Sequence, residues 1–367
     1  MKTAIVWFKN DLRLDDNLAL NAACAAADRV VSVYVLDDGA AGAWKMGGAS
    51  RWWLHHSLAS LDRDLRARGV SLLLRRGAAA EKIPELAAEV EADQVHAARS
   101  FEPWARAQDR AVATKLKEPG IAFKRHLSAQ LFAPEDIKTK TGGDYGVYTP
   151  FSKACLERVV PGPADAPARI TGIADIPGDA LADWRLLPTK PDWAGGLRDA
   201  WQPGEAGANR LLKKFLAERV QKYDEARNLP GTAGTSRLSP HVHFGEISPR
   251  RVWHAAQSAK PGKGKDTFLK ELLWREFAIY LLWHHPELPD APLKPEFANF
   301  PWAENPAHLR AWQTGKTGYP IVDAGMRELW KTGWMHNRVR MIAASFLIKH
   351  LLISWQAGEA WFWDCLA

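Results

Sequence analysis

Residues 3–36, TAIVWFKNDLRLDDNLALNAACAAADRVVSVYVL, contain two short apolar runs separated by an Ala-rich segment. The runs Ala4–Phe8 and Val30–Leu36 have the length and composition of buried strands, and residues 17–27 between them have the pattern of an amphipathic helix. Because a strand, a helix and a second strand in this order form a crossover unit, this stretch predicts a parallel sheet.

The same alternation continues to about residue 127. Further apolar runs occur at Val70–Leu74, Gln94–Ala97 and Ile121–Lys124, with helical patterns at 50–68, 79–92 and 104–117. We therefore expect a doubly wound α/β domain with helices on both faces and a ligand at the carboxyl ends of its strands. The segment after the first run is KNDLRLDDN and contains no GxGxxG, which argues against a dinucleotide dehydrogenase.

The rest of the chain changes character twice. Residues 130–205 hold nine of the 23 Pro and little periodicity, whereas the sequence is helical in pattern from about 207 onward. We predict three parts: an α/β domain at 1–130, an interdomain connector wrapped on the surface at 131–205, and an all-α domain at 206–367.

Charge and Trp are concentrated in the second half. The chain has 367 residues, a net charge of +7 and 18 Trp; residues 201–367 hold 22 Lys+Arg against 16 Asp+Glu and 11 of the 18 Trp. A basic surface with stacking side chains indicates a nucleic-acid partner. The alternative from charge alone is a slightly basic enzyme with a Trp-rich core.

Other features are consistent with a cytoplasmic protein. The three Cys form no CxxC pair, the opening apolar run is too short for a signal peptide, and no stretch is long enough for a membrane helix. The His pairs lack partners at metal-ligand spacing, so no metal site is expected. The absence of heptads is consistent with a monomer.

A Gly-rich turn at 231–240, GTAGTSRLSP, is the first candidate site. Its four hydroxyl side chains and free amides, with Arg237 beside them, resemble a phosphate cradle. A capped loop of turn-forming residues is the alternative.

The second candidate is the helical segment KELLWREFA at 270–278. Helical spacing places Glu271, Trp274 and Arg275 on one face, opposite an apolar face that would be buried. This trio has the groups needed to hydrogen-bond a base edge, stack on a base and hold a phosphate. An exposed helix face with a Glu271–Arg275 ion pair is the alternative.

The third candidate is GWMHNRVRM at 333–341, at the start of a long helix. Asn337, Arg340 and Met341 project to one side, together with the small Ala344, which would let a flat ligand approach. A core helix with a polar first turn is the alternative.

Taken together, these segments resemble the DNA photolyase/cryptochrome family. The matching stretches include AIVWFKNDLRLDDN, GGASRWWLHHSL, YDEARNLPGTAGTSRLSPHVHFGEISPR, ELLWREFAIYLLWHHP and the region from Asn305 to Trp355. The motifs cover nearly the whole chain in the family's order, and the chain most resembles a class I cyclobutane pyrimidine dimer photolyase. The resemblance implies a flavoprotein lyase of DNA repair in which excited, reduced FAD passes an electron to a pyrimidine dimer flipped out of the duplex.

The resemblance also implies roles for individual positions. Glu271, Trp274, Asn337 and Met341 match the lesion pocket and are the implied catalytic residues. The positions that match contacts to FAD are Tyr223, Thr235, Ser236, Arg237, Leu238, Ser239, Arg275, Trp334, Asn337 and Arg340. The positions that match contacts to DNA are Arg227, Glu271, Trp274, Arg275, Asn337 and Arg338. Trp302 and Trp355 match two members of the electron-transfer chain.

Two departures from the family pattern qualify these implications. The segment RSFEPWARAQD lacks the Asn-Glu pair of folate-binding members, so a deazaflavin or flavin antenna is favoured, with Arg51 nearby. Family members continue beyond Phe362–Cys365, so we expect the helical domain to be incomplete at its end. The expected function is therefore light-driven dimer repair, with a cryptochrome-like photoreceptor or a catalytically impaired photolyase as the alternatives.

Overall fold

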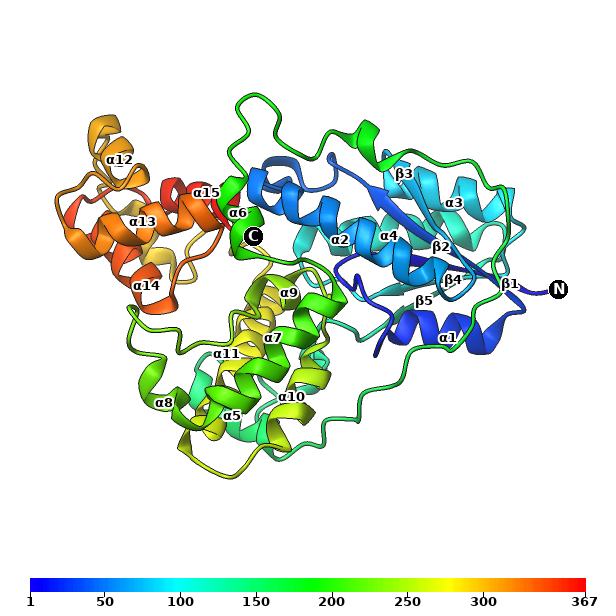
Figure 1. The fold of residues 1–367 in the computed structure, drawn as a ribbon, viewed down its shortest axis with the longest axis horizontal. Coiled ribbons are helices and arrows are strands. Elements are labelled where there is room, and N and C mark those ends of the chain that lie inside the picture. The colour runs from blue at the N-terminus through cyan, green and yellow to red at the C-terminus, as the bar shows by residue number, and fades with distance from the viewer.

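The amino-terminal third of the chain forms a five-stranded, entirely parallel sheet (Figure 1). A computed structural model describes residues 1–367. In this part the elements are β1 (Thr3–Phe8), α1 (Leu18–Ala26), β2 (Arg29–Leu36), α2 (Gly48–Arg66), β3 (Leu72–Arg76), α3 (Ala79–Glu89), β4 (Gln94–Ala98), α4 (Pro103–Lys117) and β5 (Ala122–His126). The strand order β3-β2-β1-β4-β5 is that of a doubly wound fold, which confirms the predicted fold class.

Helices cover both faces of this sheet. On β1, Val6 and Phe8 pack with α1 and α2, whereas Ile5 and Trp7 pack with α3 and α4. Every residue of β1 is buried. This two-sided burial explains why the strand is a continuous apolar run and does not alternate with polar residues.

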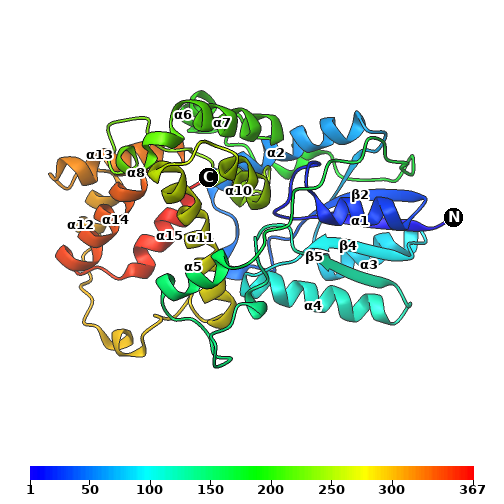
Figure 2. The same cartoon turned by 90° about the horizontal axis from the view of Figure 1, so that it is seen from below.

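The remainder of the chain is helical, with α11 at its centre (Figures 1 and 2). Its helices are α5 (Tyr148–Leu156), α6 (Gly195–Ala200), α7 (Glu205–Glu218), α8 (Tyr223–Ala226), α9 (Ser239–His243), α10 (Pro249–Gln257), α11 (Lys263–His284), α12 (Pro306–Gln313), α13 (Pro320–Thr332), α14 (Asn337–Ser345) and α15 (Trp355–Cys365). Helices α5, α8 and α10 pack on α11, and α12 to α15 enclose a separate apolar core. No helix has both the length and the apolar character needed to span a membrane.

The segment 131–205 is more deeply packed than a surface connector. Phe151 and Cys155 of α5 are buried in the same core as Phe277 of α11. Further along, Ile170 is buried against the sheet domain, and its amide donates to the Arg68 carbonyl. The segment therefore contributes to the cores on both sides, although the exact domain boundaries stay a prediction.

A buried ionic cluster joins the sheet domain to the helical part, and it explains the KNDLRLDDN segment. The Asp16 carboxylate accepts hydrogen bonds from Arg250 Nη2 at 2.6 Å, from Arg250 Nε at 3.2 Å and from the Ser248 hydroxyl. Arg13 donates to the Gly245 carbonyl at 2.9 Å and to the Ser128 hydroxyl at 2.8 Å. The KNDLRLDDN segment, which contains no GxGxxG motif, therefore holds the sheet domain and the helical part together.

Candidate cofactor and nucleic-acid site

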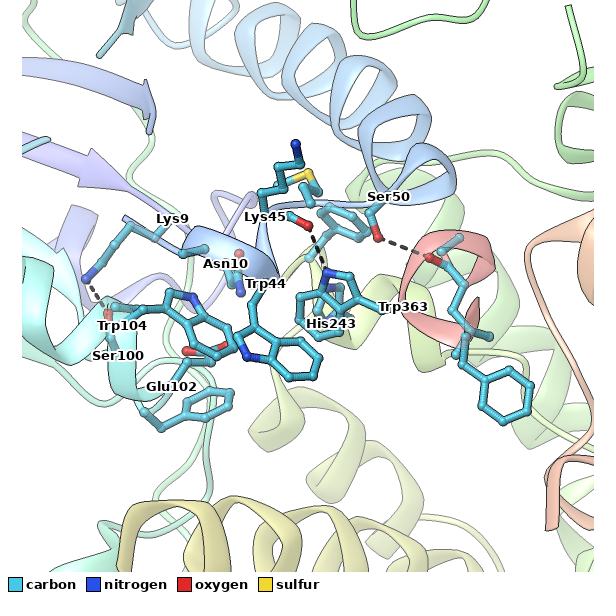
Figure 3. A pocket seen from close by; sticks show the side chains of 18 of the residues that line it. Lys9, Asn10, Trp44, Lys45, Ser50, Ser100, Glu102, Trp104, His243 and Trp363 are labelled. Carbon is cyan, nitrogen blue, oxygen red and sulfur yellow. Dashed lines mark hydrogen bonds between the residues drawn. The ribbon is translucent and has the colours of Figure 1, made fainter. Parts of the chain in front are cut away.

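A large cavity lies between the sheet domain and the helical part. It has a volume of about 750 Å³ and is lined by the loops after β1, β2 and β4 together with α14 and α15. The order in which strands are added to the sheet changes direction between β1 and β4, so this cavity occupies the crevice where doubly wound sheets bind ligands. At its polar end, Lys9 Nζ donates to the Ser100 hydroxyl and to the Asp109 carboxylate, each at 2.7 Å (Figure 3).

Three Trp side chains gather at this cavity (Figure 3). The rings of Trp44 and Trp104 are nearly parallel, with centroids 6.2 Å apart, and Trp363 meets both of them edge-on. The Trp363 indole N–H donates to the Lys45 carbonyl at 2.9 Å, which anchors α15 against the loop after β2. The result is an aromatic surface suited to a flat ring system.

A second cavity of about 450 Å³ continues the first into the helical part. The two share five lining residues, namely Asn10, Phe101, Ala129, Ser239 and His243. Its other walls include Tyr223, Ser236, Leu238, Glu271 and Arg275. Together the two compartments form an elongated, largely apolar site with a few hydroxyl and charged groups, which suits a dinucleotide with two ring systems.

Two polar side chains of the larger cavity have buried atoms without a hydrogen-bond partner. These atoms are Arg340 Nε and Glu359 Oε2. Burial lowers the pKa of Arg340 and raises the pKa of Glu359 to about 7. Because buried polar groups are almost always satisfied in native proteins, both atoms indicate a polar ligand, and the residues present fit FAD.

His243, which lines both compartments, is held in its neutral form. Its accessible surface faces the cavity, deep in the molecule, and desolvation there lowers its pKa to about 4. The nearby Arg275 charge acts in the same direction. The imidazole is therefore uncharged at neutral pH.

Charged and aromatic side chains line the outer rim beside the second cavity. Arg227 forms an ion pair with Glu271, and Arg338 donates to Asn228 Oδ1 from Nε at 3.0 Å and from Nη2 at 2.8 Å. Trp274 stands nearby with 48% of its surface exposed. These are the groups expected where single-stranded nucleic acid is held by its phosphates and bases.

The residues proposed from the sequence do not all reach the cavities. The positions that line one or both are Tyr223, Ser236, Leu238, Ser239, Glu271, Arg275, Trp334, Arg340 and Trp355. The positions that line neither are Arg227, Thr235, Arg237, Trp274, Trp302, Asn337, Arg338 and Met341. Asn337 and Met341 are exposed at the start of α14, and Met341 lies 3.9 Å from Arg338 Nη1.

Arg237 and Arg51 are engaged elsewhere. The Arg237 guanidinium lies between the rings of Trp201 and Trp334, at 4.4 and 4.8 Å from their centroids. Arg51 forms an ion pair with Asp38 and does not line the larger cavity. In this structure, Arg237 makes cation–π contacts that join the loop after α13 to the connector.

Sequence reasoning missed several residues that shape the site. Tyr148 stacks on Trp274, and Asn228 accepts hydrogen bonds from Arg338. The third case is the group formed by Trp44, Trp104 and Trp363. The excess of Trp was a signal for the last group. Tyr148 lies in a segment of weak periodicity, and nothing in the local sequence marks it.

The fold and the site define a nucleotide-cofactor-binding protein with an α/β domain and a helical domain. The family described as DNA photolyase matches residues 4–169, and the FAD binding domain of DNA photolyase matches residues 268–367. A deoxyribodipyrimidine photo-lyase from Agrobacterium fabrum is 46% identical over 373 residues, covering 100% of this chain and 77% of the relative. Cryptochrome-1 of Arabidopsis thaliana is 34% identical, covering 99% of this chain and 55% of the relative.

Among solved structures, a bacterial class III photolyase from Agrobacterium tumefaciens superimposes with a TM-score of 0.96. It is 45% identical, with 100% of this chain and 76% of that chain covered. The chain belongs to the DNA photolyase/cryptochrome family, and it carries that family's FAD-binding domain. The family expected from the sequence is thus confirmed, but the expected similarity to class I is corrected, because this structural neighbour is of class III.

Proposed function

We propose that this chain is a lyase that splits cyclobutane pyrimidine dimers in DNA with the energy of blue light. One observation carries the proposal. A cavity suited to FAD lies directly beside a rim that presents an acidic, an aromatic and two basic side chains, Glu271, Trp274, Arg227 and Arg338. A photoreceptor that signals through a protein partner has no need of that rim.

FAD, when bound and reduced, supplies the excited electron for repair. The chain's own contribution is to hold and shield this group. The hydroxyls of Ser236 and Ser239 and the ring of Tyr223 line the smaller cavity, and Arg340 offers an unpaired guanidinium to an anionic ligand in the larger one. Trp355 lines the larger cavity, as a residue of an electron-transfer chain to the flavin would.

The rim is suited to a flipped-out dimer. Arg227 orients the Glu271 carboxylate, which can accept a hydrogen bond from an N–H at the edge of a pyrimidine. Trp274 offers a stacking surface, and Arg227 and Arg338 attract the phosphates on either side. Asn337 and Met341 complete the rim from α14.

The remaining assignments belong to the same proposal. The aromatic surface formed by Trp44, Trp104 and Trp363 would take a second, antenna chromophore, a deazaflavin or flavin in preference to a folate. The partner is DNA that contains pyrimidine dimers, the protein acts as a monomer, and its location is the cytoplasm.

A repair assay with controls tests the proposal. The flavin-loaded protein is mixed with an oligonucleotide that contains one thymine dimer, and dimer loss is followed by chromatography in blue light and in the dark. We expect loss in the light only, strongly reduced by Glu271→Ala. Selective light-dependent binding of a protein partner without any dimer loss would favour the cryptochrome alternative and overturn the proposal.

A further inference from the structure

The half-exposed Trp274 is covered on one face by a residue from a distant part of the chain. The rings of Tyr148 and Trp274 lie parallel, with an interplanar angle of 6° and a centroid distance of 3.6 Å. Tyr148 begins α5, 126 positions before Trp274 in the sequence (274 − 148). Because the stack covers one face of the indole, the exposed surface of Trp274 consists of the opposite face and an edge.

Tyr148 is itself fixed at both ends of its side chain. Its hydroxyl donates to the Lys270 carbonyl at 2.9 Å, one helical turn before Trp274 on α11. Burial raises the pKa of Tyr148 to about 12, so this hydroxyl remains a donor at neutral pH. At its base, α5 is anchored by Phe151, which packs on Phe277 and Tyr280 in the helical core. Phe277 also meets both stacked rings edge-on.

We infer that Tyr148 is a positioning residue for substrate recognition, which holds the Trp274 indole in one orientation so that its free face can stack on an unpaired pyrimidine. The inference rests on the proposed function, since it assigns the recognition of the lesion to that rim. The supporting geometry is the juxtaposition of a half-buried, doubly anchored phenol ring and an exposed indole. Tyr148 does not touch the substrate and acts only through Trp274.

The physical basis is the loss of conformational freedom. An exposed Trp without a neighbour samples several rotamers, and a ligand that needs one of them must select it at a cost in affinity. The stabilisation that a stacked aromatic pair typically supplies changes an equilibrium constant by about threefold to tenfold. We therefore expect Tyr148 to contribute about threefold to tenfold to the affinity for dimer-containing DNA.

The experiment measures binding in the dark to two single-stranded oligonucleotides that differ only in one thymine dimer. Tyr148→Leu removes the stack but keeps apolar volume, whereas Tyr148→Phe keeps the stack and removes only the hydroxyl. We expect Tyr148→Leu to lose about threefold to tenfold in affinity for the dimer, and Tyr148→Phe to stay within about twofold of wild type. Tyr319→Leu is the matched control, because Tyr319 is a tyrosine at the surface that also packs on an aromatic ring, that of Phe346, outside the rim.

A double-mutant cycle separates positioning from a general effect on folding. If Tyr148 acts through Trp274, Tyr148→Leu has no further effect on dimer affinity once Trp274→Ala is present. Equal losses in both backgrounds, or unchanged discrimination in Tyr148→Leu, would overturn the inference. If the wild-type protein does not distinguish the two oligonucleotides at all, the proposed function itself fails, which is a separate outcome. Circular dichroism and urea titration confirm that each variant is folded.

Discussion

Replacing Asp16 by Asn should strongly destabilise the joint between the sheet domain and the helical part. The Asp16 side chain is fully buried and faces Arg250, which is almost fully buried as well. Asp16 has a φ of +55°, in the left-handed region, which Asn also tolerates. The substitution therefore preserves backbone and shape and removes only the negative charge.

The magnitude follows from the burial of the pair. Removing one partner of a buried ion pair typically costs about 3–5 kcal/mol, because the remaining charge is buried without compensation. The Asn oxygen still accepts one hydrogen bond, so we expect a loss near the lower limit, about 3 kcal/mol in the free energy of unfolding. The pair Lys82–Glu85 is a surface pair, and Glu85→Gln should change the same quantity by less than about 0.5 kcal/mol.

Urea unfolding monitored by intrinsic Trp fluorescence measures both variants against wild type. We expect the midpoint to fall substantially for Asp16→Asn and to stay unchanged for Glu85→Gln. If Asp16→Asn is no more destabilising than Glu85→Gln, the ionic cluster does not hold the two parts together. The explanation given for the KNDLRLDDN segment would then be wrong.

Three further predictions concern single residues. Burial raises the pKa of Glu276 to about 7 from an ordinary value of 4.5, so the folded state binds the extra proton and wild-type stability falls as pH rises from 4.5 to 7. In urea titrations at several pH values, Glu276→Gln should lose about 3 kcal/mol less of its free energy of unfolding between pH 4.5 and 7 than the wild type does. If the free energies of unfolding of the two proteins change in parallel with pH, this prediction is wrong. Gly207→Ala places a Cβ atom 1.9 Å from a backbone oxygen and should lower the free energy of unfolding by about 1–3 kcal/mol. Gly195→Ala is the control and should be tolerated, because no atom lies closer than 3.8 Å to its Cβ position. Equal urea midpoints for the two variants would refute this prediction. Asn228→Ala releases Arg338 without removing its charge, so affinity for single-stranded DNA should fall about twofold while its salt dependence stays constant; a shallower salt slope would argue against positioning.

The sheet domain could be predicted from the sequence because its strands are local, continuous apolar runs. Two-sided burial of β1, and of β2 after Arg29, leaves these strands almost entirely apolar, which is visible without knowledge of neighbours. The apolar face of α11 was equally readable, since Leu273, Phe277 and Tyr280 are buried at helical spacing. Local periodicity is thus enough where burial follows from the element itself.

The site was less predictable because its contacts join distant segments. Glu276 is buried on α11 and accepts the amides of Leu131 and Phe132, which helical periodicity does not reveal. Arg237 follows the hydroxyl side chains of the Gly-rich turn in sequence, but its guanidinium lies between the rings of Trp201 in the connector and Trp334 in the loop after α13. The local sequence around Arg237 does not indicate these contacts. Such contacts depend on the packing of helices around α11, which no local pattern encodes.

Dimer repair by the flavin-loaded, reduced protein under blue light tests the central claim most directly. Absorption spectroscopy first establishes that flavin is bound, and chromatography then follows the thymine dimer in a single-stranded oligonucleotide. We predict that the dimer returns to two thymines in the light and persists in the dark. A protein that contains reduced flavin and binds the oligonucleotide, yet leaves the dimer intact in the light, would contradict the proposed function.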